Sequence, residues 1–297
     1  MDLRLKYQLA EQEEEEVNAY FQRYTVDKGL QSSQAVTFLV EGREDAVIDP
    51  TQCYLKTTFR VVDGNGNELK NTPNVFATAN HSANLWSQVG VSLNNTELPP
   101  GNDYPYTSAL IDLLGASPLV RDGVLNPIAG WGNVHDGGSK VDTILADDAD
   151  SLNDYKNIVN RSQIVDVYQR VHSDFLMSRS QPLPNRMQLG ITLTRGKDPF
   201  VLCRGPGEVG KDFKIEVRSV SLFVRRVQPS PVRLAELNAS LAQGGKLKYQ
   251  RLQMLVFACG KGNLNWSWHN CFHNVLPRRV FVALVSQEAY FGSYNRV

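Results

Sequence analysis

Apolar and polar residues alternate with a period of two along much of the chain. The alternating stretches are residues 36–40, 55–61, 187–193 and 213–217, and a continuous apolar run follows at 220–227. Successive side chains of a strand point to opposite faces, so this period is typical of strands that bury one face. The pattern predicts a β sandwich whose first unit closes near residue 228.

A turn is predicted after the strand that ends near Val61. Residues 63–67 read Asp-Gly-Asn-Gly-Asn, and these residue types tolerate the positive φ angles of tight turns. We therefore expect the chain to turn back there as a hairpin. Residues 86–93 are predicted as the partner strand, because Val89 and Val91 share one face of it.

Two short helices and one long excursion interrupt the strands. Residues 104–114 carry leucines and an isoleucine at helical spacing, and Gly115 is placed to end that helix. Ser230 and Pro231 form an N-cap and first turn, which predicts a linker helix within residues 229–246. Residues 116–160 are rich in Gly and Asp and weakly periodic, which indicates an excursion from the sheet.

The two ends of the chain differ from this first unit, which spans residues 30–228. Residues 1–29 include an acidic stretch with Glu13 to Glu16, and we expect an acidic N-terminal arm outside the core. Residues 252–258 and 280–286 are apolar on both faces, which is typical of strands covered on both sides.

The chain after the linker is short for a second sandwich. The 51 residues after position 246 supply only about four or five strands. Residues 247–297 are therefore predicted to be the start of an incomplete second unit. Its strands should lack neighbours and expose apolar faces and unpaired backbone groups.

Composition and charge narrow the function classes. Hydrophobic residues make up 42% of the 297 residues, enough to fill a core, and 31 Lys and Arg balance 31 Asp and Glu. A neutral chain has no global field that draws it to nucleic acid or to an anionic membrane, so we expect neither as a specific partner. The start of the chain has no signal-peptide pattern, so we expect an intracellular protein, in cytoplasm or nucleus, whose four cysteines are reduced.

Residues 205–211, Gly-Pro-Gly-Glu-Val-Gly-Lys, match the spacing of a phosphate-binding loop. That loop needs a helix after it and a Ser or Thr after the lysine, but Asp212 follows Lys211 and residues 213–227 alternate as a strand. Pro206 also lacks the N–H that such a cradle uses. A glycine-rich turn is the better interpretation.

His269, Cys271 and His273 would lie on one face of a strand and could supply three zinc ligands. The sequence places no fourth ligand nearby, so these residues are more simply interpreted as part of an aromatic-rich segment. We expect no metal and no cofactor.

Other polar residues also lack the partner residues that a catalytic or ligand-binding site needs. The aspartates of residues 147–154 have neither the glycine nor the final glutamate of a calcium loop. His135 with Asp136 and His172 with Asp174 have no activated nucleophile in the sequence pattern, so surface hydrogen bonding is the expected role.

Two arginine pairs and two tryptophans remain. Arg225-Arg226 and Arg278-Arg279 could contact phosphate, and Trp266 with Trp268 could stack on bases. Arginines on a strand edge that discourage unwanted pairing are the favoured interpretation. We predict no catalytic residue.

The order of several segments resembles one family, the double jelly-roll major capsid proteins of Polinton (Maverick) elements and adintoviruses. The segments that carry the resemblance are residues 36–66 (VTFLVEGREDAVIDPTQCYLKTTFRVVDGNG), 79–98, 104–115, 164–176 (IVDVYQRVHSDFL), 183–203, 220–231, 262–284 (GNLNWSWHNCFHNVLPRRVFVAL) and 289–294 (AYFGSY). They cover nearly all of the chain from about residue 35 onward.

The resemblance implies an all-β fold of the viral double jelly-roll type, with short helices and, here, an incomplete second jelly roll. It implies a structural subunit of a virion, or of a truncated or domesticated element, that forms a homotrimer serving as a pseudo-hexagonal capsid block. A minor capsid (penton) protein is a further implied partner. Residues 116–160 are the expected place of subunit contacts.

Two other functions stay open at this point. A jelly-roll module could bind carbohydrate, with Trp131, Tyr104 and Tyr106 as stacking surfaces. An enzyme would need a metal held by His269, Cys271 and His273.

Overall fold

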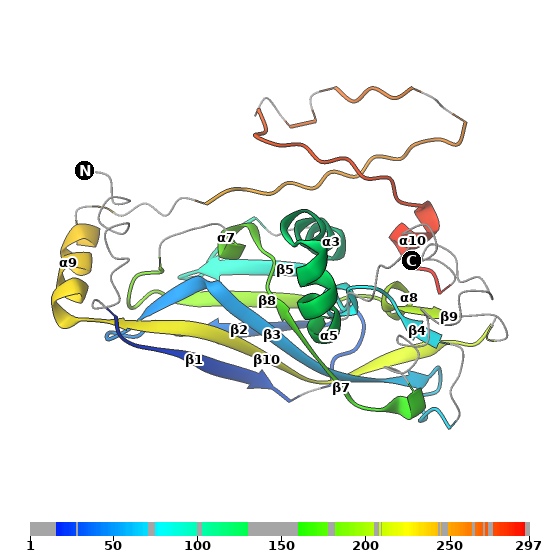
Figure 1. Ribbon diagram of the computed structural model, residues 1–297, viewed down its shortest axis with the longest axis horizontal. Coiled ribbons are helices and arrows are strands. Elements are labelled where there is room, and N and C mark those ends of the chain that lie inside the picture. Colours follow the sequence, from blue (N-terminus) through cyan, green and yellow to red (C-terminus); the bar gives the residue numbers. More distant parts are fainter. Residues whose placement is uncertain are drawn as a thin grey trace.

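The computed structural model contains two four-stranded antiparallel sheets, a small two-stranded sheet and several short helices (Figure 1). It describes residues 16–27, 29–70, 75–99, 103–129, 160–177, 182–204, 208, 210–242, 244, 249–262, 265–269, 271–272 and 276–294. The strands are β1 (Glu16–Val26), β2 (Ala35–Val40), β3 (Val47–Asp63), β4 (Val75–Ala77), β5 (Trp86–Leu93), β6 (Thr96–Glu97), β7 (Val165–Arg170), β8 (Leu189–Arg195), β9 (Leu202–Arg204) and β10 (Phe213–Pro229). The helices are α2 (His81–Asn84), α3 (Tyr104–Gly115), α4 (Pro118–Val120), α5 (Asn126–Ala129), α7 (Asp174–Met177), α8 (Asp198–Val201), α9 (Pro231–Ala242) and α10 (Gln287–Phe291), with single turns η2 (Arg121–Leu125) and η3 (Asn160–Ser162).

The strand order is that of a jelly roll. One sheet has the order β1-β10-β3-β7 and the other β2-β8-β5-β6, and all neighbours are antiparallel. Counted in chain order without the small β4-β9 pair, the sheets read 1-8-3-6 and 2-7-4-5. Two interlocked Greek keys produce this order, which defines the eight-stranded jelly roll. The predicted all-β jelly-roll fold class is therefore confirmed.

The core lies between the two sheets. Inward residues such as Leu55, Phe59 and Val61 of β3 face Leu189, Ile191 and Leu193 of β8, and all six are buried. Alternate residues of the same strands point outward, as the period of two predicts.

A β-bulge changes which residues of β10 face the core. The register with β3 shifts between Val217 and Ser219. Before the shift, Phe213, Ile215 and Val217 are buried. After it, the core residues are the even-numbered Val220, Leu222 and Val224, and Arg226, Ser221 and Val227 are also buried. One extra residue in a strand switches which alternate positions face the core. The two predicted runs are therefore two parts of the single strand β10.

Both predicted helices are confirmed, and each is bounded as expected. α3 ends at Gly115, and α9 begins at Pro231 with the Ser230 Oγ accepting from the Arg233 N–H at 3.3 Å. Strand β10, which precedes α9, ends at Pro229, where the linker was predicted to start.

Two expectations are wrong. The turn at residues 63–67 forms, but residues 86–93 (β5) pair with β8 and β6 rather than with β3. Alternation reveals which face of a strand is buried, whereas a jelly roll pairs strands that are far apart in sequence.

Residues 16–26 of the expected N-terminal arm form the edge strand β1, in which Tyr20, Gln22, Tyr24 and Val26 face inward. Residues 1–15 lie outside the described part.

Candidate assembly surface

The largest group of exposed apolar side chains lies in residues 249–286, which we call the arc. Figure 1 shows the arc as a long loop that stands clear of the two sheets before the chain returns to α10. Its eleven exposed large apolar side chains are Leu252, Val256, Phe257, Trp266, Trp268, Leu276, Val280, Phe281, Val282, Leu284 and Val285. Soluble monomers rarely gather so many exposed large apolar side chains in one segment, which makes the arc a candidate contact with another molecule.

The described backbone of the arc has no strand neighbour. Residues 252–258 and 280–286 belong to no sheet ladder, so the prediction of strands there is wrong. A strand needs a partner at hydrogen-bonding distance, and none of the described strands lies beside these stretches. The expectation that this part of the chain exposes apolar side chains is confirmed: Leu276 is 94% exposed and Leu284 is 83% exposed.

The first end of the arc is fixed to the sandwich. The ring of Tyr249 packs edge-on against that of Phe175, with centroids 5.7 Å apart. The hydroxyl of Thr107 on α3 donates to the sulfur of Met254 at 3.5 Å.

The second end is fixed through α10 and the residues after it. Tyr290 stacks on Tyr106 with centroids 5.9 Å apart, and its hydroxyl donates to Asp103 Oδ1 at 3.1 Å. Tyr294 donates from its hydroxyl to the Phe213 carbonyl at 2.7 Å. The arc is therefore a loop held at both ends.

Within the arc, two distant positions meet. The rings of Phe257 and Trp268 stack at 4.6 Å with an interplanar angle of 19°. Both side chains remain partly exposed, so the stack joins the outgoing and returning limbs without burying them.

The charged residues of the arc are all basic, and none is Asp or Glu. These residues are Arg251, Lys261, Arg278 and Arg279, and all four are exposed. The arc thus presents apolar and positive groups together.

A second exposed apolar group lies in residues 113–128, at the end of α3 and along α4, η2 and α5. We call it the helical face. Its exposed members are Leu113, Leu114, Leu119, Val120, Val124 and Ile128, and Leu119 is 83% exposed. The face opens the excursion that was predicted to carry subunit contacts, while residues 130–159 lie outside the described part.

A polar stripe on α3 fixes the helix that leads to this face. Tyr104, Ser108 and Asp112 recur every four residues and therefore lie on one side of the helix. Ser108 Oγ lies 2.7 Å from His172 Nδ1, and Asp112 Oδ1 lies 3.1 Å from His172 Nε2. The Tyr104 hydroxyl accepts from the His172 N–H at 3.3 Å.

The partners of His172 define its role. A carboxylate only accepts hydrogen bonds, so His172 Nε2 donates to Asp112, while Nδ1 and the Ser108 hydroxyl share a hydrogen bond. Ser, His and Asp also stand in a row in serine hydrolases, but Ser108 has no exposed surface and no substrate can reach its oxygen. The row is a buried clamp between α3 and the end of β7.

This clamp corrects the sequence interpretation of His172. His172 is buried rather than at the surface, and its carboxylate partner is Asp112 rather than Asp174. Asp174 instead accepts from the Phe175 N–H at 2.8 Å. The four-residue spacing of Tyr104, Ser108 and Asp112 was the sequence signal that could have revealed the clamp.

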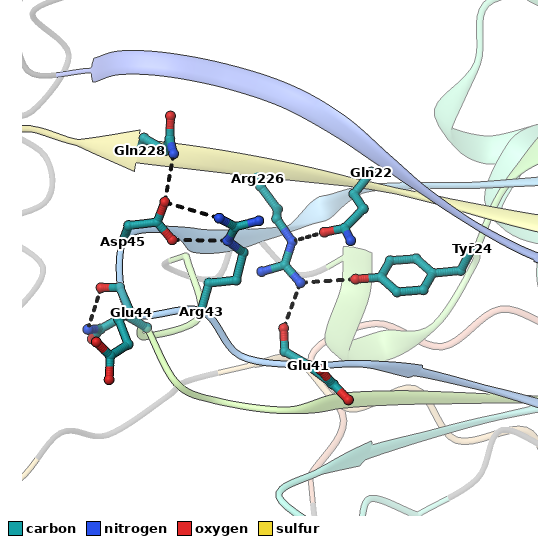
Figure 2. Close-up of polar contacts among 9 residues, drawn as sticks. Gln22, Tyr24, Glu41, Arg43, Glu44, Asp45, Arg226 and Gln228 are labelled. Carbon is teal, nitrogen blue, oxygen red and sulfur yellow. Dashed lines mark hydrogen bonds and ion pairs between the residues drawn. The ribbon is translucent and has the colours of Figure 1, made fainter.

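Arg226 closes one end of the sandwich (Figure 2). It is 1% exposed and occupies an inward position that the bulge in β10 creates. Its guanidinium donates to Gln22 Oε1 at 2.5 Å, to the Tyr24 hydroxyl at 3.0 Å and to the Glu41 carbonyl at 2.6 Å. The cluster joins β1 and β10 of one sheet to the end of β2 in the other, so Arg226 is not the edge arginine that the sequence suggested.

The loop beyond β2 carries an exposed polar group beside this cluster. Figure 2 shows Asp45 between Arg43 and Gln228. Arg43 Nε donates to Asp45 at 3.0 Å and Gln228 Nε2 donates at 2.9 Å, and these bonds, the one from Arg43 first, lower the pKa of the Asp45 carboxyl. The group fixes the loop rather than forming a site.

The candidate zinc ligands are not brought together in the described residues. His269 is exposed, Cys271 donates from Sγ to the Trp268 carbonyl at 3.4 Å, and His273 lies outside the described part. No group of three potential ligands occurs among the residues that the structure describes.

The other sequence candidates are placed as follows. β10 begins two residues after Lys211, so a strand follows the glycine-rich segment, as predicted. Tyr104 is buried, with its pKa raised by that burial, and cannot offer a stacking surface. Tyr106 is half-buried against Phe200 and Tyr290, while Trp131, His135 and Asp136 lie outside the described residues.

Searches of family models and of curated proteins find no match. Among solved structures, a chain in the 3.5 Å cryo-EM structure of the Sputnik virophage is similar, with 13% identity and a TM-score of 0.48 over 73% of this chain and 49% of that one. The Faustovirus major capsid protein is also similar, with 9% identity and a TM-score of 0.36 over 74% of this chain and 56% of that one. So is a chain in the PBCV-1 virus capsid, with 8% identity and a TM-score of 0.36 over 74% of this chain and 45% of that one.

This chain thus spans about half the length of the solved structures it matches. The jelly-roll assignment comes from its own strand order. None of the helices described here has the length and apolar character needed to span a membrane.

Proposed function

We propose that the protein is a structural, capsid-type subunit that works by associating with other copies of itself. The observation that carries the proposal is the arc, whose eleven exposed large apolar side chains are held at both ends on a jelly-roll sandwich. Covering such a surface releases water and is the main source of affinity in obligate assemblies. This function needs no reaction and no cofactor.

The sequence resemblance adds the finer parts of the proposal. The element of origin would be a virus or a Polinton-like element, and the copies would form a trimer whose sandwiches build a pseudo-hexagonal block in a virion. A minor capsid protein would be a second partner. Residues 247–297 would belong to a second jelly roll.

A carbohydrate-binding function has less support. Tyr104 is buried and Tyr106 is already stacked on Tyr290, so neither offers the free aromatic face that a sugar ring needs.

Sedimentation velocity of the purified chain across a wide range of concentrations tests the proposal. We expect association that approaches three copies, together with slowed hydrogen exchange in the arc. A chain that stays monomeric at every concentration, with the arc as protected as the sheets, contradicts it.

The excursion has its own test. Removing residues 116–160 and joining the ends with a short linker should leave a folded monomer that no longer associates. Unchanged trimers would exclude the excursion from the contact.

A further inference from the structure

The charge of the arc decides which surface it can contact. The arc contains no Asp or Glu, and its charged residues are the exposed Arg251, Lys261, Arg278 and Arg279. Two arcs placed face to face would bring these like charges together, and such juxtaposition opposes association. The contact surface on the second copy must therefore differ from the arc.

The helical face has the properties that the arc requires. Its six exposed apolar side chains lie within residues 113–128, and the only charged residues there are Arg121 and Asp122, which balance. It is thus an apolar surface without net positive charge. Together the two surfaces hold 17 of the 23 exposed large apolar side chains of the described chain.

The arc does not cover the helical face of its own chain. Its first end contacts Thr107, in the first half of α3, whereas Leu113, Leu119 and the rest of the face remain exposed. Among the described residues, nothing covers either surface, so both can contact another copy.

The exposed apolar area of the arc is large enough for one side of a specific contact. At about half exposure, eleven large apolar side chains offer on the order of 900 Å². A stable interface buries roughly 800 Å² on each partner.

We propose that the arc of one copy covers the helical face of a neighbouring copy, a contact that rests on the self-association proposed above. Such a contact is heterologous, because each copy gives its arc to one neighbour and its helical face to another. In a closed ring of three copies, every arc and every helical face is covered by a neighbouring copy.

Two variants separate the two sides of the contact. Val282→Asp with Leu284→Asp changes the arc, and Leu119→Asp changes the helical face; these side chains are 78%, 83% and 83% exposed, so the fold should be unaffected. Burying each new carboxylate opposes the contact, so each variant alone should associate at least about tenfold more weakly than the unchanged chain. Val232→Asp, at an exposed position on α9 outside both surfaces, should associate normally.

Mixing the two variants gives the decisive measurement. An arc variant still has an intact face and a face variant still has an intact arc, so an equal mixture should form pairs of two chains and nothing larger in sedimentation velocity. A mixture that stays monomeric, or a face variant that associates like the unchanged chain, overturns the proposal. If the unchanged chain itself never associates, the proposed function fails instead.

Anionic occupants are tested in the same samples. If the arc variant associates normally but loses binding to oligothymidine or to phosphatidylserine vesicles that the unchanged chain shows, the arc serves a nucleic acid or a membrane, and the proposal is wrong.

Discussion

The guanidinium of Arg226 donates a hydrogen bond to the Glu41 carbonyl at 2.6 Å. This bond joins β10 of one sheet to the end of β2, an edge strand of the other sheet. The described residues give Arg226 no carboxylate partner, and its Nη1 has no hydrogen-bond acceptor there. Arg226 therefore stabilises the fold by filling the space between the sheets and by three hydrogen bonds to neutral oxygens.

Arg226→Ala should lower the free energy of unfolding by ~3 kcal/mol, because it removes these bonds and leaves a cavity. Arg226→Met should cost less than about 1 kcal/mol, since it fills the space without a buried charge. Arg225→Ala is the matched control: Arg225 is partly exposed and pairs with Asp49 at 3.2 Å, so its loss should also cost about 1 kcal/mol or less. Equal losses for Arg226→Ala and Arg225→Ala in urea unfolding would contradict this account.

The clamp on α3 gives a second prediction. Ser108 and Ser82 are both buried serines, but Ser108 Oγ is hydrogen-bonded to His172 whereas Ser82 Oγ has no hydrogen-bond partner among the described residues. Ser108→Ala should lower the free energy of unfolding by ~1.5 kcal/mol and speed hydrogen exchange in residues 104–115. Ser82→Ala should be neutral or stabilising, and thermal unfolding of both variants should give this order; the reverse order would exclude a clamp.

The stability of the fold should depend on pH through His81. Burial lowers the pKa of His81 to about 4 from its ordinary 6.5, while Nδ1 donates to the Thr78 carbonyl at 3.3 Å. The unfolded chain binds a proton near pH 6.5 and the folded chain does so only near pH 4. Stability is therefore complete above pH 6.5 and should fall by ~3 kcal/mol between pH 6.5 and 4.

His81→Asn keeps a donor toward Thr78 and does not titrate. The free energy of unfolding of this variant should change less between pH 6.5 and 4 than that of the unchanged chain, by about the same ~3 kcal/mol. Parallel pH curves for the two proteins would assign the dependence to other groups.

Gly42 marks a close approach of two loops. A Cβ placed on Gly42 would collide with the main chain of Arg186, which cannot move without disturbing the hydrogen bond from its N–H to the Arg43 carbonyl at 2.9 Å. Gly42→Ala should cost at least ~2 kcal/mol in chemical unfolding. Gly115→Ala, where a Cβ meets open space, should change stability by less than about 1 kcal/mol, and a similar loss at both sites would show that space is not the cause.

The sequence pattern predicts the faces of strands better than their partners. The alternation of residues 36–40, 55–61 and 187–193 identifies β2, β3 and β8, because each has one face on the core. It gives no partner, so the pairing of residues 86–93 was wrong. β1 was missed because its inward positions include Gln22 and two tyrosines, which an edge strand tolerates at half exposure.

The candidate surface was predictable in part. A count of available strands predicts that the apolar residues after position 247 are exposed. It does not predict the contacts that hold the two ends of the arc. Tyr249 on Phe175 and Tyr290 on Tyr106 join residues far apart in sequence, and no local period signals such contacts. Arg226 was misplaced because the parity of β10 reverses at the bulge between Val217 and Ser219.

The pairing of β1 with β10 also constrains how the chain acquires its shape during synthesis. Glu16 lies opposite Pro229, so β1 leaves the ribosome long before β10, its one neighbour among the described strands, has been translated. Contacts of such high sequence separation form slowly. In the interval β1 would be an unprotected template for aggregation, which a chaperone could shield until translation passes residue 229.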